Sequence, residues 1–236
     1  MIRIENLTVQ FGAVKPLDDL NVELDAKICG LIGPNGAGKT TLLNVLSGFI
    51  TPKAGRVDVD GTDLLSLSPV RRVDLGLRRS FQTEQVVEDL SVYDNVLALL
   101  DHLGVARAEA RRQVSKALHF VGLDREAHRM GAELNLYQRR MLEIARGLVG
   151  APRLLLFDEP GAGMTESEGE TLRETLLAIP DEFGPQILLI DHDVELILAT
   201  CSKTLVLDFG QFLTYGPTAD VLAEDIVKRA YLGVDV

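Results

Sequence analysis

The stretch GPNGAGKTT, residues 33–41, decides the fold of this chain. It matches the pattern G-x-x-x-x-G-K-[ST], follows the apolar run ICGLIG (residues 28–33) and precedes a helix predicted over about residues 40–46. A buried strand, a glycine-rich loop and a helix in this order form a phosphate-binding loop, because backbone N–H groups can then turn inward around phosphate oxygens. The predicted nucleotide-binding residues of the loop are Asn35, Gly36, Ala37, Gly38, Lys39, Thr40 and Thr41.

Two side chains of this loop have chemistry that the backbone cannot supply. Lys39 is expected to place a point charge between the β- and γ-phosphates, and the Thr40 hydroxyl is expected to bind Mg²⁺. The loop therefore predicts a site for a nucleoside triphosphate with its metal ion.

A second apolar strand ends in two acids, in LLLFDEP, residues 154–160. One carboxylate at the end of a buried strand can hold the water shell of Mg²⁺, and a second can polarise an attacking water. We assign the first role to Asp158 and the second to Glu159. The alternative is a pair of solvated acids at a strand end, and the phosphate loop favours the catalytic interpretation.

The remaining pattern predicts how the chain is organised. Residues 2–24 alternate at period two, with Ile2, Ile4, Leu7, Val9, Phe11, Leu20, Val22 and Leu24 on one side, which predicts half-buried antiparallel strands. Strands return at about residues 154–157 and 187–190, each followed by a helix, which is a parallel α/β pattern. Residues 203–216 predict a closing hairpin, and Val57, Val59 and Asp60-Gly61 predict another.

The fold class predicted is α/β: a P-loop NTPase (RecA-like) core with an antiparallel β subdomain and an inserted helical subdomain. We expect a single domain over residues 1–236. Residues 1–87 and 151–236 would form the core, and about 88–150 the helical part. Ser91 with Asp94 is expected to cap the first helix of that part.

Composition limits the class of partner. The net charge is −11, from 24 basic and 35 acidic residues, which disfavours wide contact with nucleic acid. Two arginine clusters are expected to be solvated faces: Arg71, Arg72, Arg78 and Arg79, and Arg107, Arg111 and Arg112. Because no run approaches the ~20 apolar residues of a membrane helix, membrane association is expected only through a partner. Cys29 and Cys201 are expected to be buried reduced thiols, which suits the cytosol.

These motifs resemble those of an ABC-type ATPase, the nucleotide-binding subunit of an ABC transporter, over the whole chain. The resemblance implies ATP and Mg²⁺ as ligands and adds further site residues. Phe11 before Gly12 resembles the aromatic residue that stacks on adenine, and Gln82 resembles the Q-loop glutamine that meets the metal. His192 resembles the switch histidine at the γ-phosphate, and residues 161–168, GAGMTESE, lie where the family has its D-loop. The implied metal-site residues are Thr40, Gln82 and Asp158, and the implied catalytic residues are Glu159 and His192.

The subfamily follows from shorter stretches. GLRRSFQ (76–82), LSVYDNVL (90–97), DEPGAGM (158–164) and the ending IVKRAYLGVDV (226–236) resemble the ATPases of branched-chain amino acid uptake systems. That ending also resembles the ATPase of lipopolysaccharide export, which stays open as an alternative. The resemblance implies a second ABC ATPase subunit, membrane permeases and, indirectly, a solute-binding protein. It also implies a cytoplasmic subunit, peripheral on the inner face of the plasma membrane.

One segment departs from the family pattern. ELNLYQRRMLEIARGL (133–148) aligns with the signature segment, where the family has Leu-Ser-Gly-Gly-Gln and this chain has Leu134, Asn135, Leu136, Tyr137 and Gln138. In the family this segment binds the ATP held by the partner subunit. Asn135 can still cap the following helix, but Leu136 and Tyr137 lack the backbone freedom of glycine.

Two interpretations of this departure stay open. In the first, the chain is half of an asymmetric heterodimer whose partner site turns over slowly; in the second, the altered signature is tolerated in an ordinary subunit. A regulatory subunit that binds ATP without turnover is a further alternative. An ATPase acting on nucleic acid or ribosomes is disfavoured, since residues 82–134 hold only an ordinary helical region and no long coiled coil.

Overall fold

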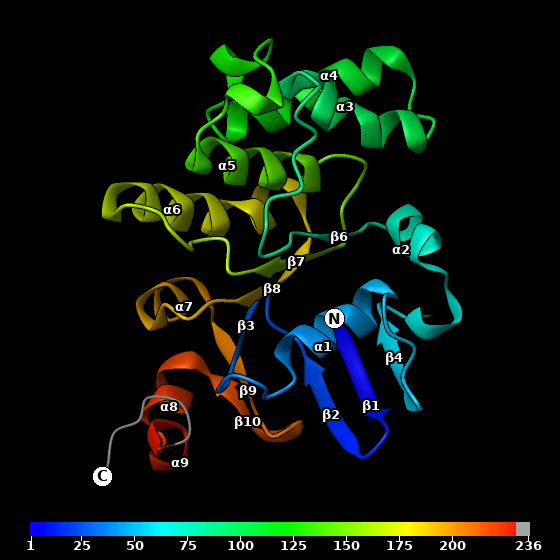
Figure 1. Cartoon of the computed structure of the whole chain (residues 1–236), viewed down its shortest axis with the longest axis vertical. Coiled ribbons are helices and arrows are strands. Elements are labelled where there is room, and N and C mark those ends of the chain that lie inside the picture. Colours follow the sequence, from blue (N-terminus) through cyan, green and yellow to red (C-terminus); the bar gives the residue numbers. More distant parts are fainter. Residues whose placement is uncertain (230–236) are drawn as a thin grey trace.

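The computed structural model describes residues 1–229, and two β-sheets with surrounding helices form the fold predicted from the sequence (Figure 1). The last seven residues, including most of the ending IVKRAYLGVDV, lie outside the described residues. Figure 1 shows α3, α4 and α5 at the upper end of the molecule, and β1 and β2 toward its lower end.

The first sheet is antiparallel, with strand order β2-β1-β4-β5. Its strands are β1 (Ile2–Phe11), β2 (Val14–Leu24), β4 (Ala54–Val59) and β5 (Thr62–Asp63). The predicted alternation is confirmed through Val9, because Ile2, Ile4, Leu7 and Val9 are buried. Phe11 does not continue this face, since it ends the strand at the tip of the β1–β2 hairpin and is 56% exposed. The predicted turn at Asp60-Gly61 is confirmed, with φ of 48° and 82° at its two central residues.

The second sheet has strand order β10-β9-β3-β8-β7-β6. Its parallel strands are β3 (Ile28–Ile32), β6 (Leu77–Arg79), β7 (Leu154–Asp158), β8 (Gln186–Ile190) and β9 (Lys203–Asp208). The predicted closing hairpin is confirmed, because β10 (Gln211–Pro217) pairs antiparallel with β9. Parallel strands end at one edge of a sheet, so the loops after β3, β6, β7 and β8 meet there.

Two hydrophobic clusters cover the two faces of this second sheet. Leu154 and Leu156 of β7 point into the cluster shared with the first sheet and α1 (Lys39–Ser47), whereas Leu155 and Phe157 point the other way. The opposite cluster contains residues of α3 (Val92–His102), α4 (Arg107–Phe120), α5 (Leu136–Gly147), α6 (Glu166–Phe183) and α7 (Val194–Thr200). The continuous apolar strands of the sequence are thus explained by burial on both faces.

The helix starts follow the predicted caps. Ser91 accepts from the Asp94 N–H at 3.0 Å at the start of α3, and Asn135 accepts from the Gln138 N–H at 2.8 Å at the start of α5. The remaining helices are α2 (Pro69–Leu75), α8 (Thr218–Ala223) and α9 (Asp225–Val227), with 3₁₀ turns at Leu64–Ser66, Asp124–Glu126 and Gly131–Glu133. No helix within residues 1–229 is both long and apolar enough to cross a bilayer.

The prediction for the first arginine cluster is wrong. Arg72, Arg78 and Arg79 are buried, and only Arg71 is on the surface. Arg72 donates to the Leu46 carbonyl at 2.9 Å, and Arg78 donates to the Gly150 carbonyl at 3.1 Å. A guanidinium can be buried when its donors meet acceptors, and these acceptors come from distant parts of the chain. The second cluster, Arg107, Arg111 and Arg112, is exposed as predicted.

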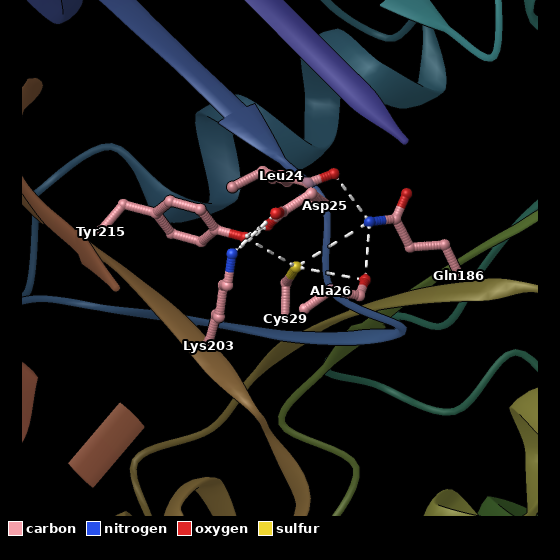
Figure 2. A network of polar contacts seen from close by, with 7 residues as sticks. All are labelled: Leu24, Asp25, Ala26, Cys29, Gln186, Lys203 and Tyr215. Carbon is pink, nitrogen blue, oxygen red and sulfur yellow. Dashed lines mark hydrogen bonds and ion pairs between the residues drawn. The ribbon is translucent and has the colours of Figure 1, made fainter. Parts of the chain in front are cut away.

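A polar network joins the two sheets at the amino ends of the parallel strands (Figure 2). The Tyr215 hydroxyl donates to Asp25 at 2.8 Å, and the Lys203 ammonium also contacts Asp25, at 2.6 Å. Gln186 donates to the carbonyl of Leu24, the last residue of β2, at 2.9 Å. Cys29 lies within this network as a buried free thiol, as predicted, and Cys201 is likewise buried and free.

Candidate active site

The glycine-rich loop joins β3 to α1 and closes on neighbouring backbone. Gly38 is the N-cap of α1 at φ 102°, and a Cβ there would lie 2.3 Å from the Pro16 carbonyl oxygen. A side chain at this position would therefore collide with β2, so that only glycine allows this approach. The helix N-terminus behind the loop adds a partial positive charge where phosphate oxygens would lie.

Lys39 lies within this loop and is buried. Its ammonium donates to the carbonyl of Gly33 at 2.6 Å and to that of Pro34 at 3.1 Å. Burial lowers the pKa of Lys39, while the negative charges of Glu159 and Asp158 act in the opposite direction. The Lys39 ammonium is thus held by two neutral carbonyl groups, which the oxygens of a bound phosphate can replace as acceptors.

A cavity of 330 Å³ lies at this edge of the sheet. It brings together most of the predicted site residues, which come from four separate elements. Its lining consists of Pro16, Asn35, Gly36, Ala37, Gly38, Lys39, Thr40, Thr41, Gln82, Glu159, Ile190 and His192. The spacing of these residues along the sequence does not predict that they lie together. They do so because the parallel strands that precede them end at the same edge of the sheet.

The glutamate after β7 is held by the backbone and by two polar side chains. Glu159 has φ 53°, and its N–H donates to the Ile190 carbonyl at 2.8 Å. Its carboxylate accepts from Gln82 Nε2 at 3.2 Å, and the other oxygen lies 3.1 Å from His192 Nε2. A left-handed backbone at a residue other than glycine is strained and is often found at functional sites.

Asp158 is buried directly behind Glu159. Its N–H donates to Ser80 Oγ at 3.2 Å, and Oδ2 lies 3.6 Å from Arg79 Nη2. Burial raises the pKa of the Asp158 carboxyl, and the Arg79 guanidinium opposes that rise. The pattern of the sequence did not identify Arg79 or Ser80 as neighbours of the site, because Arg79 belongs to a cluster predicted to be a solvated face and no motif indicates a role for Ser80.

Not every predicted residue lies at the cavity. Phe11 is not among its lining residues, and Pro16, which no motif indicated, is. None of the signature residues Leu134–Gln138 lines the cavity among the described residues either. The predicted signature segment therefore lies outside this cavity.

The signature segment forms a reciprocal cap at the start of α5. The Asn135 N–H donates to Gln138 Oε1 at 3.2 Å, while Asn135 Oδ1 accepts from the Gln138 N–H. Tyr137 is partly buried against the hydrophobic cluster of the helices; burial raises the pKa of its hydroxyl, and the nearby Thr171 side chain of α6 acts in the opposite direction. Leu136 is 41% exposed, and its Cδ2 lies 3.0 Å from where a Gly163 Cβ would stand.

One further acid was missed by the motifs. The Asp191 carboxylate accepts from the Asp193 N–H at 2.9 Å and from the Gly161 N–H at 3.3 Å. It thereby ties the loop after β7 to the loop that carries His192. The only sequence signal was its place at the end of the strand before the histidine.

The arrangement can bind a phosphate chain over the loop and present a carboxylate beside it. Residues 17–162 match the sequence pattern of the ABC transporter family. The chain belongs to the ABC transporter family. ABC transporter ATP-binding domains hydrolyse ATP, and the chain is therefore an ATPase of this family.

Similar ABC proteins match nearly the whole chain. The high-affinity branched-chain amino acid transport ATP-binding protein BraF of Pseudomonas aeruginosa is 30% identical over 249 residues, covering 99% of this chain and 98% of BraF. The lipopolysaccharide export system ATP-binding protein LptB of Escherichia coli is 30% identical over 233 residues, covering 98% of this chain and 96% of LptB. The ADP conformation of MJ1267, an ATP-binding cassette of an ABC transporter, has a TM-score of 0.86 and 27% identity, covering 99% of each chain.

Proposed function

We propose that this ABC ATPase powers the uptake of branched-chain or other hydrophobic amino acids, or of related small solutes. The observation that carries the proposal is the cavity in which the glycine-rich loop, Gln82, Glu159 and His192 converge within a chain similar to BraF over nearly its whole length. The cavity supports ATP turnover, and the likeness to BraF supports the class of solute.

The positions of these residues support the roles that we propose for them. Backbone N–H groups of the loop bind the phosphate chain of ATP, and Lys39 exchanges its carbonyl partners for the β- and γ-phosphates. Glu159 orients and polarises the attacking water, and His192, whose Nε2 lies 3.1 Å from the Glu159 carboxylate, contacts the γ-phosphate. Phe11 is exposed beside β2 and remains our candidate for stacking on adenine.

The residues present fit a magnesium site. A hydroxyl at Thr40, an amide at Gln82 and a carboxylate at Asp158 are oxygen donors of the kind that Mg²⁺ prefers. Thr40 and Gln82 line the same cavity, and Asp158 lies one residue before Glu159. Bound there, Mg²⁺ would neutralise charge on the β- and γ-phosphates.

Membrane permeases are the proposed partners for the movement that hydrolysis drives. The segment after Gln82 is irregular, and it joins the site to the helices over about 88–150, which we propose to move as one unit. Arg140 donates to the carbonyls of Phe81 and Gln82, at 3.1 and 2.9 Å, so α5 holds this segment directly. A change at the γ-phosphate would thereby reach the helical part and a permease docked on it. A cytoplasmic location, peripheral on the plasma membrane, and a solute-binding protein as an indirect partner belong to the same proposal.

Reconstitution tests the solute. The chain is purified together with the permeases that bind it, inserted into proteoliposomes and supplied with ATP inside and with labelled leucine and a binding protein outside. ATP-dependent accumulation that is lost in Lys39→Met supports the proposal. Co-purification with permeases that extract lipopolysaccharide, without accumulation of leucine, would replace it with the alternative that the likeness to LptB supports.

A second candidate is asymmetric function, which the signature segment favours. The side chain of Leu136 is exposed at the position where the family has glycine, and Tyr137 is anchored to α6. A partner subunit with an unaltered signature would then complete the site of this chain, while the ATP of that partner would turn over slowly. Strong, cooperative hydrolysis by the isolated homodimer would contradict asymmetry.

A further inference from the structure

Arg79 is buried between the site and a second cavity. It is the last residue of β6, where it pairs with Leu156 of β7, and its side chain is only 5% exposed. Arginine is rarely buried to this extent, because its charge and its five N–H donors must find partners. The partners of Arg79 therefore indicate why the chain holds it there.

The Arg79 guanidinium connects two elements of the active site. Its Nη1 donates to Asn44 Oδ1 at 2.6 Å and to Ser47 Oγ at 2.8 Å, both on α1, and its Nη2 lies 3.6 Å from Asp158 Oδ2 at the end of β7. The helix α1 begins at Lys39 and carries Thr40 in its first turn. A helix is rigid over nine residues. The hydrogen bonds from Arg79 to Asn44 and Ser47 therefore also fix the position of Thr40, at the other end of α1, relative to Asp158.

The same guanidinium is covered by two aromatic rings. Its Cζ lies 4.7 Å from the centroid of the Phe81 ring and 5.8 Å from that of Phe49, and the two rings meet edge to face at 5.9 Å. Phe81 directly precedes Gln82, and Phe49 is 63% exposed. Contact with these ring faces favours a fixed position of the cation.

Both rings and Arg79 also line a second cavity, of 510 Å³, which does not share the lining of the candidate nucleotide site. The lining of this cavity is largely apolar and includes Val70, Val73 and Leu99. The charged residues Glu143 and Arg146 also line it. Arg79 thus lines this cavity together with the two rings and also lies beside the Asp158 carboxylate of the site. Its Nε has no hydrogen-bond partner among the described residues.

The neighbouring arginine on β6 shows that burial alone does not require this arrangement. Arg78 is also buried, but its donors go to backbone carbonyls, among them Val73 at 2.6 Å and Gly150 at 3.1 Å. No carboxylate of the active site is among its hydrogen-bond acceptors in the described part of the chain. Arg78 is therefore a matched control for Arg79.

We propose that Arg79 is a positioning residue that fixes the Asp158 carboxylate relative to α1 and links the Phe49–Phe81 wall of the larger cavity to the metal side of the nucleotide site. Arg79 is not among the residues that line the candidate nucleotide cavity. A shift of either ring moves the guanidinium, and the guanidinium moves the carboxylate. The inference rests on the proposed role of Asp158 in the metal site.

The first experiment measures nucleotide affinity with and without Mg²⁺. A fluorescent ADP analogue is titrated into wild type, Arg79→Lys and Arg78→Lys, each in excess EDTA and in excess Mg²⁺. Lysine keeps the charge but loses the planar fork that reaches Asn44, Ser47 and Asp158 together. We expect the gain in affinity on adding Mg²⁺ to fall about 10- to 100-fold in Arg79→Lys, with the affinity in EDTA unchanged, because outer partners of metal ligands commonly have effects of this size.

The second experiment measures whether Mg²⁺ binding at the nucleotide site changes the surroundings of residue 49. The chain has no tryptophan, so Phe49→Trp introduces a single indole over the Arg79 guanidinium. Adding Mg²⁺ to the ADP-bound variant is expected to change the indole emission, and adding Arg79→Lys is expected to abolish that change. The change should persist when Arg78→Lys is added instead.

The outcomes separate the inference from the proposed metal site. A wild-type chain whose nucleotide affinity ignores Mg²⁺ overturns both. A normal Mg²⁺ response in wild type and in Arg79→Lys overturns the role of Arg79 alone, and so does an equal loss in Arg78→Lys. If Arg79→Lys does not fold, Asn44→Ala removes the acceptor on α1 and leaves the charge in place. That variant is then expected to lower the Mg²⁺ response, and an unaltered response overturns the inference.

Discussion

His192 Nε2 lies 3.1 Å from Oε1 of Glu159, although the two residues are 33 positions apart along the chain. β7 and β8 are adjacent parallel strands, and Asp158 pairs with Ile190, so the loops that follow them leave the sheet side by side. The two residues with the most direct proposed roles in hydrolysis are thus placed by strand register. Gln82 completes this arrangement from the loop after β6.

Glu159→Gln is expected to separate hydrolysis from binding. The amide keeps the shape of the side chain but cannot polarise water as a carboxylate does, so phosphate release should fall about 10²- to 10⁴-fold. Binding of ATP should be retained, because Lys39 and the loop are untouched. Phosphate release and equilibrium binding are measured in parallel, with Glu174→Gln at an exposed position of α6 as the control. Unaltered hydrolysis would show that the proposed mechanism is wrong.

Lys39→Met is expected to weaken nucleotide binding itself. The substitution removes a buried cation that would make charge-assisted hydrogen bonds worth roughly 1.5–3 kcal/mol, which corresponds to an affinity loss of about 10- to 150-fold. Isothermal titration with ADP measures the effect. Lys53→Met, at an exposed lysine whose ammonium donates to Gln10, should bind ADP as wild type does, and a similar loss there would point to a general effect of charge.

Buried thiols are expected to resist alkylation in the folded chain. Burial raises the pKa of Cys201 to about 12 and also raises that of Cys29. At about pH 8 a thiol with such a pKa is thiolate on the order of one part in ten thousand, and the thiolate is the reactive form. Iodoacetamide should therefore modify neither cysteine in native buffer and both in denaturant, as counted by mass spectrometry. Rapid native labelling would contradict the buried positions.

The same shift has a consequence for stability at high pH. The folded pKa of Cys201 is raised, so the unfolded state loses its proton first. Its contribution to the unfolding free energy is full below the ordinary thiol pKa and is lost as pH rises from about 9 towards about 12. Cys201→Ala should flatten this part of the curve in chemical denaturation.

The sequence predicted those parts of the site that are contiguous or end a strand. The glycine-rich loop and the Asp158-Glu159 pair are recognisable from the spacing of neighbouring residues. The antiparallel strands are recognisable from the alternation of apolar and polar residues. The burial of Arg72, Arg78 and Arg79 could not be predicted, because charge patterns normally indicate surface and the acceptors lie far away in sequence. The contacts of Tyr215 with Asp25 and of Gln186 with Leu24 are hidden for the same reason.

The signature segment combines one contact that the sequence predicts with one that it could not predict. Asn135 could be predicted as a cap because its partner, the Gln138 N–H, is three residues away. That Tyr137 packs onto Thr171, instead of pointing outward with Leu136, depends on how α6 lies beside α5. The two residues that replace glycine thus differ in their surroundings. Tyr137 is partly buried within the chain, whereas Leu136 is exposed.

Leu136→Gly is expected to raise the rate of ATP hydrolysis by the isolated chain. The reciprocal cap uses the N–H groups of Asn135 and Gln138, and the N–H of Leu136 lies in the first turn of α5, where a helix has no internal acceptor for it. Removing the exposed side chain would let the γ-phosphate held by a second copy approach this donor. One regained charge-assisted hydrogen bond predicts a rise of about 10- to 100-fold.

The comparison that interprets this result is Leu136→Ala. Alanine removes most of the bulk and keeps the restricted backbone, so a rise in both variants attributes the defect to the side chain, and a rise in glycine alone attributes it to the backbone. Tyr137→Gly would instead remove the contact with α6, and we expect it to lower the unfolding free energy because a partly buried aromatic residue is lost. If neither Leu136 variant changes the rate of phosphate release, the altered signature is tolerated and the asymmetric interpretation fails.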